Sequence, residues 1–88
     1  MKKKEGFILR DVCGEKVIIG EGLNALDFGK MISMNETAAW LWEHAEGDFH
    51  VNGLVEELCE EYNVDTEKAR HDVTKIVSDW KKMGIIEE

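Results

Sequence analysis

The sequence predicts an α+β fold, in which a small three-stranded antiparallel sheet is followed by three helices. Through residues 1–34, glycines alternate with short apolar or β-branched runs, as expected for short strands joined by turns. From residue 36 onward, apolar side chains recur at helical spacing instead. The 88 residues contain no proline, internal repeat or linker-like segment, so we expect one domain over residues 1–88.

The strands are expected between about residues 7 and 34. Phe7–Cys13 and Lys16–Ile19 flank Gly14-Glu15, which is the pattern of a β-hairpin. The next residues are ambiguous and could hold a further short strand at Ala25–Phe28. Met31–Met34 has the composition of a strand of its own, and Asn35 after it suits the N-cap of a helix.

Three helices are expected, at about residues 36–45, 51–62 and 66–83. Each has one apolar face at the spacing i, i+3, i+4, i+7. In chain order, the three faces consist of Ala38, Leu41, Trp42 and Ala45; of Val51, Leu54, Val55, Leu58, Cys59 and Tyr62; and of Ala69, Val73, Ile76, Val77 and Trp80.

Caps and connections complete the helical half. Asp65 is expected to cap the third helix, and Gly84 to end it. Ile85-Ile86 could return as a short strand. Three helices joined by tight turns, with a strand after the last, are the parts of a winged helix-turn-helix-like unit, here preceded by a small sheet.

The N-terminal residues and the cysteines indicate the cellular compartment of the protein. Lys2-Lys3-Lys4 resembles the start of a signal peptide, but Arg10 interrupts the apolar run that should follow. No run approaches the ~20 apolar residues of a membrane span. We therefore expect a cytoplasmic protein. Cys13 and Cys59 match neither a disulfide framework nor a Cys-x-x-Cys pair, which favours free buried thiols.

The net charge of −8 comes from the middle of the chain. Residues 35–64 contain eight acidic side chains and no Lys or Arg, whereas acids and bases nearly balance elsewhere. Such a surface repels nucleic acid, because binding nucleic acid requires cations that neutralise phosphates. The acids form either a solvated surface that aids solubility or a docking surface for a basic partner.

Catalytic patterns are missing from the sequence. His44, His50 and His71 do not form a known metal-ligand spacing, and there is no glycine-rich phosphate loop or nucleophile elbow. Glu56-Glu57 and Glu60-Glu61 are interpreted as the solvated face of a helix rather than as paired catalytic carboxylates. We therefore expect no enzyme activity, no cofactor and no metal, and a function that depends on binding.

Two features of the helices allow more than one interpretation. On the third helix, Asp65, Asp72 and Asp79 form one stripe, and Lys68, Lys75 and Lys82 form a second stripe beside it. They could form surface ion pairs, each worth ~0.2–0.5 kcal/mol, or the charged rim of a ligand groove. Trp40 lies off the buried face of the first helix, where either the sheet covers it or it belongs to an exposed contact surface.

Several segments, in order, carry a resemblance to a known family. They are Ile32-Ser33-Met34-Asn35-Glu36-Thr37-Ala38 before Leu41-Trp42; Leu54-Val55-Glu56-Glu57-Leu58 with Glu61-Tyr62; Val64-Asp65; Asp72-Val73; and Gly84-Ile85-Ile86. Over essentially its whole length the chain resembles the PqqD family of peptide chaperones. It is also similar to the wider group of recognition elements that serve the modification of ribosomally made peptides.

The resemblance implies three antiparallel strands packed on a winged-helix-like trio of helices. It also implies that the leader segment of a precursor peptide binds as an added strand, beside the third strand and the third helix. The corresponding residues here are Lys30, Met31, Ile32, Ser33 and Met34 on the strand, and Lys68, Asp72, Lys75, Ile76 and Asp79 on the helix. An exposed strand edge suits an extended peptide, because it offers unpaired N–H and C=O groups.

The resemblance further implies a partner enzyme that modifies the bound precursor, often a radical S-adenosylmethionine (SAM) protein. We expect the chain to be a monomer or weak homodimer. A winged-helix DNA-binding regulator is the alternative. Residues 65–83 speak against it, because their charges are mixed rather than strongly basic. A small enzyme is excluded by the lack of a nucleophile–base or metal constellation.

Overall fold

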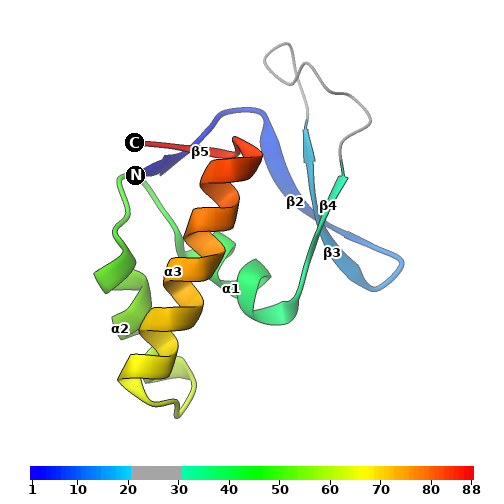
Figure 1. Ribbon diagram of the computed structural model, residues 1–88. Coiled ribbons are helices and arrows are strands. Elements are labelled where there is room, and N and C mark those ends of the chain that lie inside the picture. Colours follow the sequence, from blue (N-terminus) through cyan, green and yellow to red (C-terminus); the bar gives the residue numbers. More distant parts are fainter. Residues whose placement is uncertain (21–30) are drawn as a thin grey trace.

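The computed structural model describes residues 1–20 and 31–88, which form an α+β fold (Figure 1). Its elements are β1 (Lys2–Lys3), β2 (Phe7–Val12), β3 (Glu15–Gly20), β4 (Met31–Met34), α1 (Glu36–His44), α2 (Val51–Glu61), α3 (Thr66–Met83) and β5 (Ile86–Glu87). The expected class of fold is thus confirmed. The further strand considered near Ala25–Phe28 lies outside the described residues. None of the described helices is long and apolar enough to cross a membrane.

Strands β2, β3 and β4 form an antiparallel sheet in that order. Val12 pairs with Glu15, so the β2–β3 hairpin turns on Cys13 and Gly14, one residue earlier than expected. Both turn residues have positive φ, 53° and 83°, as the two central residues of a type I′ hairpin require. The expectation that Cys13 is buried was wrong, because this turn places it, exposed, at the tip of the hairpin.

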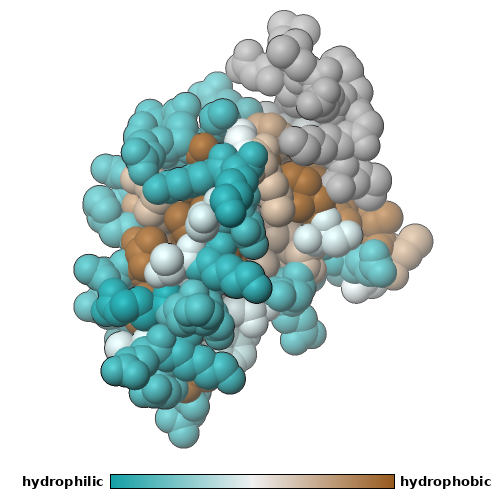
Figure 2. Space-filling view, viewed as in Figure 1, coloured by the Kyte–Doolittle hydropathy of each residue, from teal (hydrophilic) through white to brown (hydrophobic). Residues whose placement is uncertain are grey.

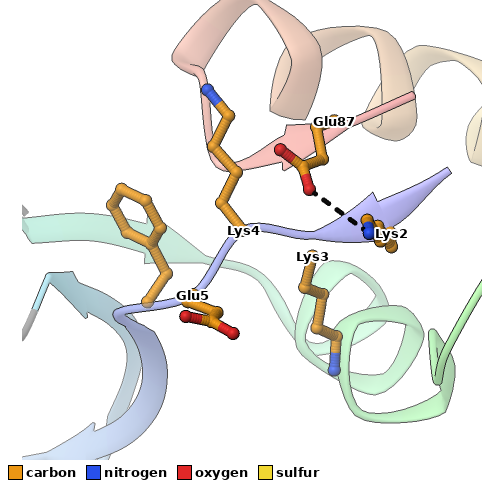
Figure 3. Close-up of a pocket in the computed structure, with 6 residues that line it drawn as sticks. Lys2, Lys3, Lys4, Glu5 and Glu87 are labelled. Atoms are coloured by element: carbon orange, nitrogen blue, oxygen red, sulfur yellow. Dashed lines mark ion pairs between the residues drawn. The ribbon is translucent and has the colours of Figure 1, made fainter. Parts of the chain in front are cut away.

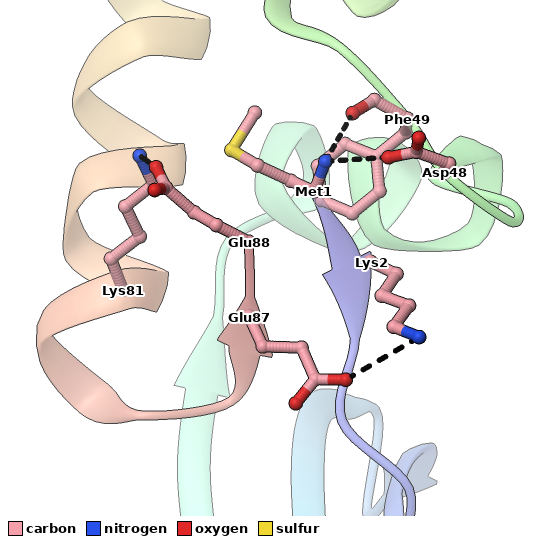
Figure 4. Close-up of polar contacts among 7 residues, drawn as sticks. All are labelled: Met1, Lys2, Asp48, Phe49, Lys81, Glu87 and Glu88. Atoms are coloured by element: carbon pink, nitrogen blue, oxygen red, sulfur yellow. Dashed lines mark hydrogen bonds and ion pairs between the residues drawn. The ribbon is translucent and has the colours of Figure 1, made fainter.

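The two ends of the chain form a second, two-stranded sheet. Lys3 of β1 pairs with Ile86 of β5, and the N–H of Lys4 donates to the carbonyl of Ile85 at 3.0 Å. Figure 4 shows polar contacts that tie this region to the helices. The Met1 amino group donates to Asp48 Oδ1 at 2.7 Å, and Lys81 pairs with Glu88 at 2.6 Å. The sequence predicted the return of the chain near Ile86 but not its partner strand.

The ends of the helices agree closely with the sequence. The Asn35 side chain accepts a hydrogen bond from the Ala38 N–H at 2.7 Å, and Gly84 ends α3 in the left-handed conformation with φ 76°. Asp65 occupies the N-cap of α3 without a side-chain cap bond. The expected position of Tyr62 was wrong. It was expected on the buried face of α2, but the helix ends at Glu61, and Tyr62 is 44% exposed.

The helices cover one face of the larger sheet. Leu9, Ile18 and Ile32 lie opposite one another across its three strands, and all three pack into the common core. Trp42 of α1 meets Trp80 of α3 edge to face, with ring centroids 5.2 Å apart. The helical part of this core consists largely of the predicted apolar faces. The β4 strand and the side of α3 that faces the sheet are therefore both anchored in the same hydrophobic core.

Candidate functional site

The outer edge of β4 is unpaired within residues 1–20 and 31–88, because β4 ends the sheet order β2-β3-β4. The register shows which backbone groups point outward. Val12 and Glu15 close a two-residue turn and so form a hydrogen-bonded pair, and the direction of the backbone groups then alternates along β3. Lys16 and Ile18 consequently direct their N–H and C=O groups toward β4.

The partners of those residues on β4 are Met34 and Ile32. Ile32 and Met34 therefore use their backbone groups within the sheet, whereas the N–H and C=O groups of Met31 and Ser33 point to the open edge. Each of the two outward residues offers one donor and one acceptor to an added strand. Lys30, also expected at this site, lies outside the described residues.

The side chains of β4 alternate between the two faces of the sheet. Ile32 is half-buried and packs against the core, and Met34 is buried at 9% exposure, so both face the helices. Ser33 is exposed on the opposite face. An extended peptide along this edge would place every second side chain on the helix side, next to Ile32.

The flank of α3 that faces the sheet can be identified from its contacts. On one flank, Arg70 donates a hydrogen bond to Asn52 of α2. Figure 1 shows α2 on one side of α3 and the larger sheet on the other. Residues on the flank opposite Arg70 therefore face the sheet. They include Ile76, which packs against the core, and Asp72 and Asp79, which are half-buried.

Of the predicted site residues, Met31–Met34 lie on β4, and Asp72, Ile76 and Asp79 lie on the flank of α3 that faces the sheet. Lys68 and Lys75 are exposed and lie farther from the buried stripe of α3 than the two aspartates. Figure 2 shows apolar surface between the hydrophilic exterior of α3 and the sheet. Met83 also belongs to this flank and is 37% exposed. Met83 was not among the residues expected at this site, although it lies seven residues after Ile76.

The Asp and Lys stripes do not form a ladder of ion pairs. Within the described part of the chain, no Asp–Lys pair at i, i+3 on α3 approaches within 4.0 Å; the ion pair that α3 does make is between Lys81 and Glu88. Asp72 and Asp79 are thus half-buried carboxylates without an ion-pair partner among these residues. The first interpretation, a ladder of surface ion pairs, therefore does not hold for these residues.

Trp40 is half-buried and packs against the core. Its ring stacks on His44, with centroids 3.9 Å apart, and meets Tyr62 edge to face at 5.7 Å. The His44 ring is fixed further by a 2.8 Å hydrogen bond between Nδ1 and the Trp40 carbonyl oxygen. Two aromatic neighbours, one from α1 and one from the end of α2, therefore contact Trp40.

A hollow lies beside β1 (Figure 3) and has a volume of about 350 Å³. Three lysines line it, together with Glu5, Phe7 and Glu87. The lysines diverge in the figure. Lys2 pairs with Glu87 at 3.7 Å, while Lys3 extends toward α1, where its Nζ lies 4.9 Å from the centre of the Trp42 ring. Burial lowers the pKa of Lys3, although Glu46 and Glu43 oppose this shift. The three ammonium groups do not converge on one ligand.

Within residues 1–20 and 31–88, no group of three or more His, Cys, Asp and Glu side chains is placed to hold a metal ion. Every buried side chain described in this part of the chain is apolar. The described surface thus offers a strand edge, an apolar flank and charged rims, which are means of binding an extended chain.

Comparison with known proteins identifies relatives. The family described as "Coenzyme PQQ synthesis protein D (PqqD)" matches residues 15–86. A search of curated protein sequences finds no match. Two solved structures are similar. "TbiB1 in Complex with the TbiA(beta) Leader Peptide" has a TM-score of 0.78 at 18% identity, over 99% of this chain and 95% of that one.

The second structure, "Lasso peptide synthetase B1 complexed with the leader peptide", has a TM-score of 0.76 at 17% identity, over 99% of this chain and 96% of that one. At such identities the two likenesses establish a shared fold. The family match extends from the first residue of β3 into β5 and includes β4 and all three helices. The chain belongs to the PqqD family.

Proposed function

We propose that this chain binds the leader segment of a ribosomally made precursor peptide as an added strand on β4, beside α3. The observations that carry the proposal are the unpaired β4 edge and the apolar flank of α3 that faces the sheet. The two solved structures described above are complexes with a leader peptide. Membership of the PqqD family supports the same function.

Backbone pairing supplies the part of the affinity that does not depend on sequence. Met31 and Ser33 direct their N–H and C=O groups outward, as the register of β3 and β4 implies. A peptide strand at this edge exchanges hydrogen bonds with these two residues, each worth about 1 kcal/mol net. Strand addition thereby also covers an edge that would otherwise be open to pairing with other chains.

Side chains on the helix side supply selectivity. A leader residue that points toward α3 meets Ile32 and Ile76, which provide an apolar floor. Asp72 and Asp79 border that floor, while Lys68 and Lys75 lie farther out. Because the aspartates are closer to the bound chain, we expect them to influence the choice of leader more than the lysines do.

The bound leader is presented to a separate modifying enzyme, and this chain performs no turnover. From the family resemblance we expect that enzyme to be a radical SAM protein. One of the structures with this fold is named a lasso peptide synthetase subunit, so lasso-type maturation is the alternative that an experiment should include. Reading frames beside the gene would supply both the precursor and the enzyme for such an experiment.

The test is an NMR titration of the ¹⁵N-labelled chain with a synthetic leader taken from the neighbouring precursor frame. We expect the largest amide shifts along residues 31–34 and on the Ile76 flank of α3, with slowed exchange at the Ser33 amide. Strong shifts confined to α1 and α2 would contradict strand addition at β4. A leader of the same composition in scrambled order is the control for charge alone.

A further inference from the structure

The outer face of α1 and α2 carries a hollow that the leader site does not use. It lies between the C-terminal end of α1 and the first half of α2, and its volume is about 730 Å³. Glu46, Asp48, Glu56 and Glu57 line it, together with the ring of His44. Neither Lys nor Arg is among the residues that line it.

One end of this hollow continues into an aromatic cluster in which His44 and Tyr62 are exposed and Trp40 is half-buried against the core. His44, at the wall, stacks on Trp40, and Trp40 meets Tyr62 edge to face. Tyr62 is 44% exposed and Val64 beside it is 37% exposed, so apolar and aromatic surface remains open to solvent. Exposed aromatic surface with a polar rim is typical of protein contact sites, where aromatic residues carry much of the binding energy.

The rim of the cluster is acidic. Glu36 and Glu43 lie four residues before and three residues after Trp40 on α1, and so flank it on the helix surface. Glu61 precedes Tyr62, and Glu57 lies one turn earlier on the same side of α2. Among the described residues, none of these four glutamates forms an ion pair within 4.0 Å.

Most of this face lies away from the proposed leader site; at its near end, Glu36 lines a hollow beside Ser33 and Met34. Figure 1 shows α2 and the larger sheet on opposite sides of α3, and the β4 edge belongs to the sheet. A partner could therefore contact α1 and α2 while a leader occupies β4. A carrier that hands a bound peptide to an enzyme needs such a second surface.

We propose that this α1–α2 face docks an arginine- or lysine-bearing segment of a partner protein, with the cation over the exposed aromatic rings and the acids around it. An aromatic face attracts a cation, and arginine is enriched in protein interfaces. The region's eight acids without a single Lys or Arg complement such a segment. The partner's role as the modifying enzyme rests on the proposed function, whereas the preference for a basic segment rests on the face itself.

The probe is a short synthetic peptide of alternating arginine and alanine, titrated into the full ¹⁵N-labelled chain. We expect shifts at the Trp40 indole N–H, at the Tyr62 backbone amide and at amides along α2. The same peptide with glutamine in place of arginine should bind much more weakly. Equal binding of the glutamine peptide, or shifts centred on β4, would overturn the inference.

Variants separate a specific face from the overall negative charge. Glu57→Lys with Glu61→Lys should weaken arginine-peptide binding by about tenfold. Tyr62→Ala should weaken it by about two- to fivefold without a change in charge. Glu5→Lys with Glu15→Lys alters net charge by the same amount at exposed positions elsewhere, and should have a much smaller effect.

If both double variants weaken binding equally, or if Tyr62→Ala leaves it unchanged, the face has no specific role and the inference is wrong. All substituted side chains are exposed, and circular dichroism checks that the variants fold. Leader affinity is measured on the same samples. In the unsubstituted chain, normal leader binding without any arginine-peptide binding would refute this inference alone, whereas arginine-peptide binding without leader binding would refute the proposed leader function.

Discussion

The β4 edge with the α3 flank differs from the α1–α2 face in the kind of chemistry that it offers. At β4, outward backbone groups of Met31 and Ser33 lie next to an apolar floor, so binding depends on main-chain geometry and shape. At α1 and α2, side-chain charges surround exposed aromatic rings. The difference suggests a division of labour, in which one surface accepts extended peptides of varied sequence and the other selects a partner by charge.

The largest effect is expected where the two surfaces share support. Trp80 is 2% exposed and packs edge to face on Trp42, which links α3 to α1. Trp80→Ala should lower the free energy of unfolding by ~3–5 kcal/mol and abolish both kinds of binding together. Chemical denaturation measures the loss, with Trp80→Phe as a milder control. Loss of only one kind of binding would show that the two surfaces are supported independently.

The next largest effect should be confined to the leader site. Ile76→Ala removes part of the apolar floor. It should weaken leader binding by about tenfold, because the bound leader then buries less apolar surface. Arginine-peptide binding at α1–α2 should not change. Thr74→Ala, at an exposed position on the same helix, is the matched control. Calorimetry measures the affinity of each variant for both peptides. If the two substitutions weaken leader binding equally, Ile76 is not part of the leader site.

Salt should affect the two surfaces differently. At ~0.1 M salt the Debye length is about 10 Å, and at ~1 M it is about 3 Å, so exposed charge pairs weaken over this range. Arginine-peptide binding to α1–α2 should fall steeply with added salt, whereas leader binding should fall much less. Titrations at several NaCl concentrations give the two slopes. Parallel slopes would mean that charge dominates at both surfaces.

The smallest effects concern the charged rim of α3. Asp72→Lys should strengthen binding of an acidic leader and Lys75→Glu should weaken it, each by only a few-fold, because surface charges contribute ~0.2–1 kcal/mol. The Asp72 variant should have the larger effect, since Asp72 is half-buried and Lys75 is exposed. Fluorescence anisotropy with a labelled leader can resolve such changes. No change in either variant would place the leader away from this flank.

Local signals in the sequence predicted the helical half well. Gly84 and the apolar stripe from Ala69 to Trp80 predicted the bounds of α3, because helix periodicity and caps are properties of nearby residues. Tyr62 was wrongly predicted to be buried in α2, because the apolar spacing continues one residue past the end of that helix. Met83 was missed because it follows the last buried residue of the helix.

Features set by distant partners could not be predicted in this way. Lys3 sits in a lysine run without any strand signal and becomes part of β1 only because Ile86 pairs with it. The flank of α3 that faces the sheet follows from the contact of Arg70 with Asn52, which joins two helices. The exposure of Cys13 depends on a turn that begins one residue earlier than glycine alone suggests.

The most direct test of leader binding by strand addition compares two proline substitutions on β4. Ile32 uses its N–H within the sheet, so Ile32→Pro should lower stability, whereas Ser33 directs its N–H outward. Ser33→Pro should therefore leave the chain folded but remove the donor that an added strand needs, and block its approach. Calorimetry with the leader should show binding weakened by at least about fivefold, corresponding to one lost hydrogen bond of about 1 kcal/mol. A folded Ser33→Pro chain that binds leader with unchanged affinity would contradict strand addition at β4.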